Sequence, residues 1–298
     1  MNELEQKEEY LQSLKSLETE NYIDRIFYRP LGYWIACHLR GTGITPNVVT
    51  IISIIVGMTG AALFYFIEPW WMVLLAILGM VLANILDCVD GQLARLTGIT
   101  SKWGRILDGA AGDLWFITLY TALSLRMYHA TGEWYWFLIA FLSLLCHLSQ
   151  ASLTDLYKTF HLAHISEEKG KEFETYAMIQ KRLKQQKPGF SKLTLRVYAF
   201  YTGIQAFYTP ELQKLVDQEE IADLTPEDRK AFRLGSRIVM KLVDLMTFNG
   251  RTIPLFILAL MGQVWCYFLY EIIFLSIVFW VARGQHELLC RSFRKQIR

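Results

Sequence analysis

The stretch WMVLLAILGMVLANILDCVDGQLARL, residues 71–96, decides the fold because an apolar run of helical length passes directly into a charged segment. Several apolar runs of about 20 residues occur in the chain, the length that crosses about 30 Å of hydrocarbon. With 53% hydrophobic and 14% aromatic residues, the chain is too apolar for an ordinary soluble domain. We therefore expect an all-α, polytopic membrane protein.

The apolar runs predict six transmembrane helices behind an N-terminal interfacial helix. Residues 23–40 carry an apolar stripe with arginines beside it, which is typical of a helix lying in the membrane interface. The run 253–281 is too long for one span, so we expect a tight turn near FLYE, residues 268–271, to divide it into two. The other four spans are predicted at residues 46–67, from residue 71 into the charged segment, at 106–128 and at 134–157.

The composition along the chain predicts four parts. Residues 161–248 are rich in Lys, Gln and Glu and too polar to cross, so we expect a cytoplasmic helical insertion there. This insertion could cover the active site, form a dimer contact, or be a solvated appendage. The other parts are a cytoplasmic N-terminus with the interfacial helix, spans one to four, and spans five and six with a basic tail, at residues 1–43, 44–160 and 249–298.

The positions of the basic residues predict the orientation. The loops at Glu68 and Glu133 are nearly free of Lys and Arg, whereas the insertion, residues 94–105 and residues 291–298 are rich in them. By the positive-inside rule, these basic parts face the cytoplasm, as expected for a protein of the inner, or cytoplasmic, membrane. The five cysteines lack the spacing of a disulfide framework or a zinc site. The net charge of +2 gives no indication of nucleic-acid binding.

The segment DCVDGQLARLTGITSKWGRILDGAAGD, residues 87–113, gathers charges at the ends of two predicted spans. At about 100° per residue, five residues of the first helix fall within about 140° and share one face. They are Asp87, Asp90, Gly91, Ala94 and Arg95. Gly104 and Asp108 add a small residue and a carboxylate from the next helix. Carboxylates clustered at one depth repel one another without cations, and oxygen ligands favour Mg²⁺ or Mn²⁺. The segment therefore predicts a metal–diphosphate site, although any one aspartate alone is as readily structural.

These residues resemble the signature of the CDP-alcohol phosphotransferase family. In that signature the aspartates, a glycine, an Ala-Arg pair and a later glycine have the same spacing as Asp87, Asp90, Gly91, Ala94, Arg95, Gly104 and Asp108 have here. The resemblance covers roughly residues 23–160. Within the family, this sequence is most similar to the phosphatidylinositol and inositol-phosphate branch. It implies that Asp87, Asp90 and Asp108 bind two divalent ions. It also implies that Asp90, Gly91, Ala94, Arg95 and Gly104 receive the CDP group, and that a last aspartate acts as general base.

The sequence departs from the family pattern at that last aspartate. The pattern places it four residues after Asp108, where the chain has Gly112, and the next carboxylate is Asp113. In a regular α-helix, Asp113 would point about 140° away from Asp108. We expect a π-bulge between them, which the GAAG sequence would tolerate, to deliver Asp113 as the general base. The alternative is that Asp113 is structural and that an acceptor phosphate or a water takes the proton.

Several weaker candidates lie near the predicted membrane surface. Asn47, Thr50 and Ser101 are candidates for the CDP pocket, although TPN at 45–47 is also an ordinary helix start. Asp155 and Lys158, at the end of the fourth span, are candidates for contact with the acceptor. Interfacial snorkelling explains Lys158 equally well.

The predicted reaction belongs to phospholipid biosynthesis. We expect transfer of a phosphatidyl group from CDP-diacylglycerol, a lipid of the membrane, to a small polar alcohol, inositol or inositol phosphate, with release of CMP. Alternatives are glycerol 3-phosphate or serine as acceptor, and transfer of a CDP-alcohol head group to a lipid hydroxyl. An intramembrane prenyltransferase, a transporter and an inactive scaffold are more distant alternatives. We expect a homodimer and no nucleic-acid partner.

Overall fold

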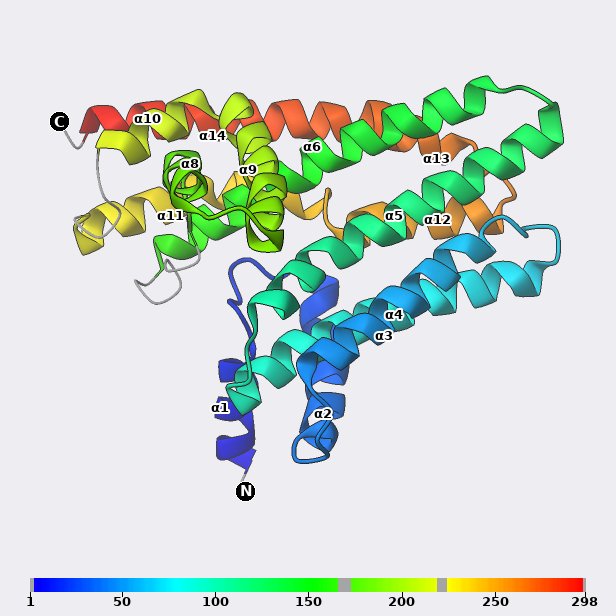
Figure 1. The fold of residues 1–298 in the computed structure, drawn as a ribbon, viewed down its shortest axis with the longest axis horizontal. Coiled ribbons are helices and arrows are strands. Elements are labelled where there is room, and N and C mark those ends of the chain that lie inside the picture. The colour runs from blue at the N-terminus through cyan, green and yellow to red at the C-terminus, as the bar shows by residue number, and fades with distance from the viewer. Residues whose placement is uncertain (1–2, 166–172, 219–223, 297–298) are drawn as a thin grey trace. The chain divides into compact units, whose positions relative to one another are not determined.

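The computed structural model describes residues 3–165, 173–218 and 224–296, and every regular element among them is helical (Figure 1). This confirms the all-α prediction. The elements in chain order are α1 (Glu3–Ser13), η1 (Asp24–Tyr28), α2 (Arg29–Leu39), α3 (Pro46–Leu63), α4 (Trp70–Thr97), α5 (Lys102–Thr131), α6 (Tyr135–Ala163), α8 (Tyr176–Gln185), α9 (Phe190–Tyr208), α10 (Pro210–Gln218), α11 (Pro226–Asp244), α12 (Phe248–Leu260), α13 (Cys266–Leu269), η3 (Tyr270–Phe274) and α14 (Leu275–Gln296).

Five stretches of the described chain are long and apolar enough to cross a membrane. They are Pro46–Leu63, Trp70–Thr97, Tyr135–Ala163, Pro226–Leu260 and Cys266–Gln296. Helix α5 runs through the predicted third span but is not one of the five. The stretch that joins α11 to α12 begins within the predicted polar insertion. The protein is therefore polytopic, and a count of six spans stays a prediction.

The last apolar stretch divides at a different place from the one predicted. Helix α12 ends at Leu260, and the chain turns over residues 261–265, where Gly262 adopts a φ of 71°. Residues 268–271 lie instead within the continuous helix formed by α13, η3 and α14. The predicted turn is wrong because Glu271, which looks like a turn residue in the sequence, is fully buried and paired with Arg251.

Two helices begin at a proline that follows a threonine, and the first of these starts is the one predicted at residues 45–47. Helix α3 begins at Pro46, although the side chain of Thr45 makes no capping hydrogen bond. Helix α11 begins at Pro226, and Thr225 Oγ1 accepts a hydrogen bond of 3.2 Å from the Asp228 backbone N–H. Proline suits the first helical position because its φ is already helical and its missing N–H would have no partner there.

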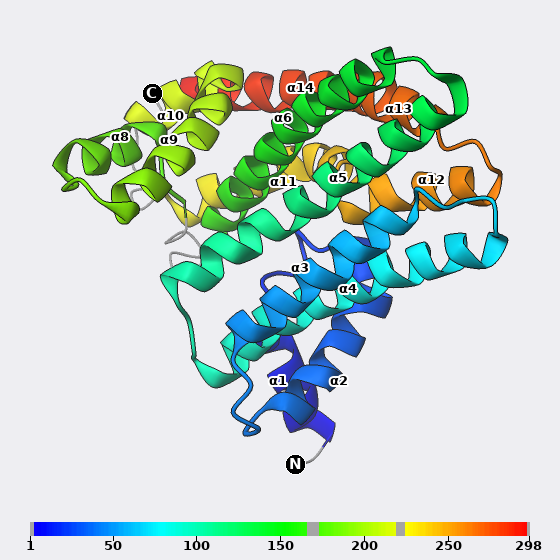
Figure 2. The same cartoon turned by 45° about the vertical axis from the view of Figure 1, so that its right-hand side comes forward.

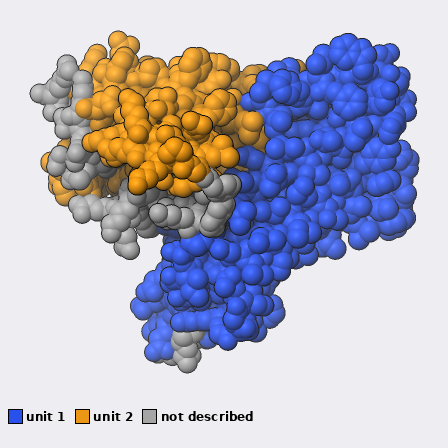
Figure 3. Space-filling view, in the orientation of Figure 1, with its two compact units in different colours: residues 1–145, 248–272 blue, residues 146–247, 273–298 orange. Residues whose placement is uncertain are grey.

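The chain forms two compact units, residues 1–145 with 248–272 and residues 146–247 with 273–298 (Figure 3). In the first unit, α3 and α4 lie side by side (Figure 2). A Cβ added to Gly60 would lie 2.8 Å from the backbone of Gly79, so the two helices approach closely only because both residues are glycine. A Cβ on Gly57 would lie 2.3 Å from Trp115 Nε1, so the indole of α5 packs directly on α3.

The N-terminal helices of the first unit pack against the charged end of α4. The buried Gly32 and Ala36 of α2 face α4, and a Cβ on Gly32 would lie 3.0 Å from Cys88 Cβ. Ile26 and Trp34 are 59% and 61% exposed, as expected for a helix in the membrane interface. Helix α1 is anchored to α2 by Tyr33, whose hydroxyl donates a 2.8 Å hydrogen bond to Glu9 Oε2.

The second unit is held together by a buried cluster of aromatic and histidine rings. His164, after α6, stacks on Phe232 of α11 with ring centroids 4.1 Å apart. Tyr157 of α6 stacks on His286 of α14 with centroids 3.9 Å apart. Helices α11 and α14 pack closely, since a Cβ on Gly235 would lie 2.6 Å from Leu289 Cδ1. These contacts fix the start of α11 next to the end of α6.

Candidate active site

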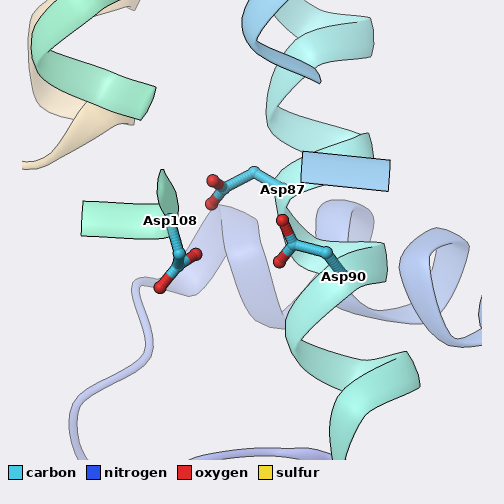
Figure 4. A group of neighbouring side chains, drawn as sticks. All are labelled: Asp87, Asp90 and Asp108. Atoms are coloured by element: carbon cyan, nitrogen blue, oxygen red, sulfur yellow. The ribbon is translucent and has the colours of Figure 1, made fainter. Parts of the chain in front are cut away.

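Three carboxylates from two helices of the first unit converge (Figure 4). Asp87 and Asp90 lie on α4, and Asp108 lies on α5. One oxygen from each carboxylate lies within 4.8 Å of the other two. Asp90 is buried, Asp87 is half-buried and Asp108 is exposed, so the group opens to one side. The predicted convergence of these aspartates is confirmed.

The spacing of the three oxygens suits a hard divalent cation. Metal–oxygen distances are about 2.0–2.6 Å, so two oxygens on one ion lie at most about 5 Å apart. Three carboxylates at one place repel one another unless a cation neutralises them, and the ligands are all oxygen atoms. The donor set therefore fits Mg²⁺ or Mn²⁺.

Thr50 holds the buried carboxylate of this group. Its hydroxyl Oγ1 lies 2.5 Å from Asp90 Oδ2 and donates a hydrogen bond to it. Thr50 is 2% exposed, so the structure places it behind Asp90. A hydrogen bond of this kind fixes the orientation of a metal-binding carboxylate.

Asn47, Ser101 and Gly104 form a second contact between helices. The Asn47 amide and the Ser101 hydroxyl exchange hydrogen bonds of 3.0 and 3.1 Å. Ser101 Oγ also accepts a 2.8 Å hydrogen bond from the Gly104 backbone N–H and caps α5. A Cβ on Gly104 would lie 2.2 Å from Asn47 Oδ1, so the amide occupies the space that a side chain would need. Asn47, Ser101 and Gly104, which were predicted separately as CDP-binding residues, are thus in direct contact with one another.

Arg95 is held by a residue that the sequence did not indicate. Its Nε donates a hydrogen bond to the carbonyl oxygen of Ser13, at the end of α1. Gln92 Nε2 donates to Ser13 Oγ over 3.1 Å and to the carbonyl oxygen of Arg29 over 3.2 Å. A Cβ on Gly91 would lie 3.3 Å from Arg95 Nη2, so the missing side chain gives the guanidinium room. The bond to Ser13 uses one of five N–H groups.

Comparison with known proteins identifies this part of the chain. Residues 43–180, slightly less than half of the 298 residues, match the family model described as CDP-alcohol phosphatidyltransferase. This segment is therefore similar to CDP-alcohol phosphatidyltransferase domains. A stretch of 76 residues is 39% identical to the archaetidylinositol phosphate synthase of Pyrococcus horikoshii. That match covers 26% of this chain and 38% of that protein, so the chain spans well under half the length of this curated relative.

The structure corrects the expectation of a π-bulge between Asp108 and Asp113. Helix α5 is a regular α-helix from Lys102 to Thr131, so Asp113 lies about 140° around the helix from Asp108. The three-carboxylate group does not include Asp113. The bulge was expected because glycine weakens a regular turn, but Ala110 and Ala111 favour it, and Ala111 is fully buried in the core. The role of Asp113 as base stays a prediction.

The two acceptor candidates lie in the second unit. Lys158 Nζ forms a 3.0 Å ion pair with Asp244 Oδ1, which joins α6 to α11. Asp155, one turn earlier, is exposed. The ion pair explains the position of Lys158 without an acceptor, and the acceptor role of both residues stays a prediction.

Proposed function

We propose that this protein transfers a phosphatidyl group from CDP-diacylglycerol to inositol or inositol phosphate and releases CMP. The observation that supports it most is the group formed by Asp87, Asp90 and Asp108 inside a segment similar to CDP-alcohol phosphatidyltransferase domains. The acceptor class rests on the relative named archaetidylinositol phosphate synthase. A step in phospholipid biosynthesis follows from these two points.

We propose that the three aspartates hold two divalent ions, Mg²⁺ or Mn²⁺. When bound, such ions neutralise the charge of a diphosphate and make its phosphorus more electrophilic. Thr50 keeps the carboxylate of Asp90 in one orientation through its hydrogen bond. The exposed side of the group, at Asp108, is where a diphosphate could approach.

Residues around the three aspartates would bind the donor. Arg95 offers the geometry for two parallel hydrogen bonds to a phosphate, and its bond to Ser13 fixes the direction of the guanidinium. The small residues Gly91 and Ala94 let a bulky anion approach α4. We propose that Asn47, through its bonds with Ser101, forms a wall of the cytidine pocket.

The reaction forms one bond and breaks another at phosphorus. The acceptor oxygen bonds to the lipid-side phosphorus, and the bond from this phosphorus to the bridging oxygen of CMP breaks. The proton of the acceptor hydroxyl must pass to a base, and we propose Asp113 for this role. Asp113→Asn tests it: turnover should fall by about 10²-fold or more if Asp113 is the base. Near-normal turnover would instead assign the proton to an acceptor phosphate or a water.

The proposal is tested with purified full-length protein in liposomes that contain CDP-diacylglycerol. Inositol, inositol 1-phosphate, glycerol 3-phosphate and serine are added separately, and CMP and the lipid product are resolved. CMP release with an inositol acceptor supports the proposal. Release with glycerol 3-phosphate or serine alone would refute the acceptor class. Consumption of a CDP-alcohol in the presence of diacylglycerol would refute the donor, and no CMP release from any pair would refute the activity.

We also propose that the active site faces the cytoplasm, that residues 161–248 lie on that side, and that the protein is a homodimer in the cytoplasmic membrane. The basic loop and tail support the orientation by the positive-inside rule. Cysteine labelling at Ser191 in inside-out but not right-side-out vesicles would agree with it, and the reverse pattern would contradict it. Cross-linking of membrane-embedded protein tests the dimer.

A further inference from the structure

Helix α9, in the second unit, carries a row of apolar side chains on its outer surface. Five of them recur every three or four residues and so form one stripe within about 80° of the helix surface. This α9 stripe consists of Leu193, Val197, Phe200, Ile204 and Phe207. Phe200 and Phe207 are 72% and 77% exposed, so the stripe has no partner within the described chain that covers these rings.

The opposite side of α9 carries polar side chains and faces the protein. Thr202 and Gln205 are buried there, and Gln205 Nε2 donates a 3.0 Å hydrogen bond to the carbonyl oxygen of Ser152 in α6. A helix on the surface of a soluble protein has the reverse arrangement, with its apolar stripe toward the core and its polar face toward water. An exposed apolar patch of this kind marks contact with another protein or with a membrane.

The C-terminal end of α9 meets two candidate membrane spans where each of them becomes polar. Ser152 lies just before Asp155, the first Asp, Glu, Lys or Arg of α6. Arg283, the first charged residue of α14, donates a 2.8 Å hydrogen bond from Nε to the carbonyl oxygen of Tyr208. The rings of Tyr208 and Trp280 lie 5.9 Å apart, and both residue types gather at the membrane–water interface. Figure 1 shows α9 running across α14, as a helix in the plane of the membrane surface would.

The charge of this segment suits an anionic membrane surface. Residues 175–209 contain six Lys or Arg and no Asp or Glu. Three of these cations, Lys187, Lys192 and Arg196, lie just before or in the first part of α9. Anionic head groups attract basic segments of this kind beside a membrane span. A second copy of the chain, related by a two-fold axis, would instead bring the same positive segment against it. The charge therefore favours lipid as the partner of the α9 stripe.

We propose that α9 lies in the membrane surface, with the α9 stripe against the acyl chains and with Lys187, Lys192 and Arg196 on the head groups of anionic phospholipids. Part of the polar insertion is thus a membrane contact and not a solvated appendage. The inference goes beyond the proposed transfer reaction, because it stands whether or not the three aspartates release CMP.

Photo-cross-linking of the full-length protein in liposomes identifies the partner of the stripe. Phe200 or Phe207 is replaced by p-benzoylphenylalanine, and the liposomes contain a phospholipid with radiolabelled acyl chains. Both positions should take up the lipid label on illumination. Ser191 is the matched control, because it is exposed on the same helix but lies about 160° around it from Leu193, and it should take up about tenfold less label. Ile277, exposed on the candidate span that contains α14, shows that the reaction works.

The results at these positions decide between lipid, a second copy and water. Label at Phe200 and Phe207 but not at Ser191 supports the proposal. A covalent dimer in place of the lipid label would assign the stripe to a second copy of the chain and overturn it. Label at Ile277 but at neither phenylalanine, or equal label at Ser191, would also overturn it.

The head-group contact is tested by comparing labelled phosphatidylglycerol with labelled phosphatidylcholine at Phe200. The anionic lipid should be preferred about fivefold or more, and Lys187→Gln combined with Lys192→Gln should remove most of this preference. Lys230→Gln combined with Lys241→Gln removes the same charge from exposed positions on α11 and should leave the preference unchanged. Equal labelling by the two lipids in the parent, or equal losses in the two double variants, would overturn the head-group contact. Unchanged helical circular dichroism shows that the variants fold.

Discussion

Replacing Gly104 with alanine is expected to damage the candidate active site more than the overall fold. The new Cβ would lie 2.2 Å from Asn47 Oδ1, whereas carbon and oxygen atoms rarely approach closer than about 3.3 Å. The Asn47 side chain must therefore move by about 1 Å. Both of its hydrogen bonds with Ser101, at 3.0 and 3.1 Å, are lost or weakened by this movement.

The size of the effect follows from these two bonds. Each contributes about 0.5–1.5 kcal/mol, so their loss costs about 1–3 kcal/mol. Alanine gains about 1 kcal/mol over glycine in a helix, which leaves a net loss of about 0–2 kcal/mol in the free energy of unfolding. If Asn47 lines the donor pocket, the KM for CDP-diacylglycerol should rise about tenfold. Denaturant unfolding in detergent and CMP release measure the two effects.

A matched control and a double variant separate this steric cause from a general effect of alanine. A Cβ on Gly112 of the same helix would meet nothing within 4 Å, so Gly112→Ala should stabilise the protein by up to about 1 kcal/mol. In an Asn47→Ala background the clash is absent, and Gly104→Ala should cost little. If the two losses simply add, or if Gly112→Ala destabilises as much as Gly104→Ala, the steric explanation is wrong.

Four other perturbations test separate parts of the structure. Asp90→Asn, or removal of divalent cations by a chelator, should abolish CMP release without loss of helical circular dichroism, and full activity after chelation would contradict the metal site. Thr50→Val should raise the Mg²⁺ concentration for half-maximal activity about 10–100-fold, because Asp90 loses its hydrogen bond. Arg95→Lys should raise the KM for the donor about tenfold or more, since lysine cannot form two parallel bonds to a phosphate. Because burial lowers the pKa of His164 to about 4 from 6.5, protonation favours the unfolded chain. Stability should therefore fall by up to about 3 kcal/mol from pH 6.5 to 4, and less in His164→Asn.

Local helix geometry made the main features of the site predictable. Asp87 and Asp90 are three residues apart on one helix, and this spacing alone places them on one face. Asp108 follows a short loop between two helices whose ends lie at one membrane depth, so the approach of its carboxylate to the other two was also expected. The start of α3 followed from the fixed φ of Pro46.

Contacts between distant parts of the chain could not be predicted in this way. Arg95 and Ser13 are 82 residues apart, and Thr50 and Asp90 are 40 residues apart. Helix α1 is a charged helix whose sequence carries no sign that its last carbonyl meets an arginine of the motif. The sequence gives the residue types that such contacts need, but tertiary packing decides which of them meet.

The wrongly predicted π-bulge shows that tertiary contacts also decide the local geometry of the backbone. The described chain has two π-helical segments, Asp24–Tyr28 and Tyr270–Phe274, and each is tied to the first turn of α12. Asn249 Nδ2 donates a 2.7 Å hydrogen bond to Asp24 Oδ1, and the Tyr270 hydroxyl donates one of 2.7 Å to the carbonyl oxygen of Gly250. Glycine-rich sequence only lowers the resistance of a helix to widening, whereas a bond to another helix supplies the free energy that holds the wider turn. Among the described residues, no atom lies within 4 Å of a Cβ on Gly109 or Gly112, so no contact at these two positions favours a wider turn and the regular helix persists.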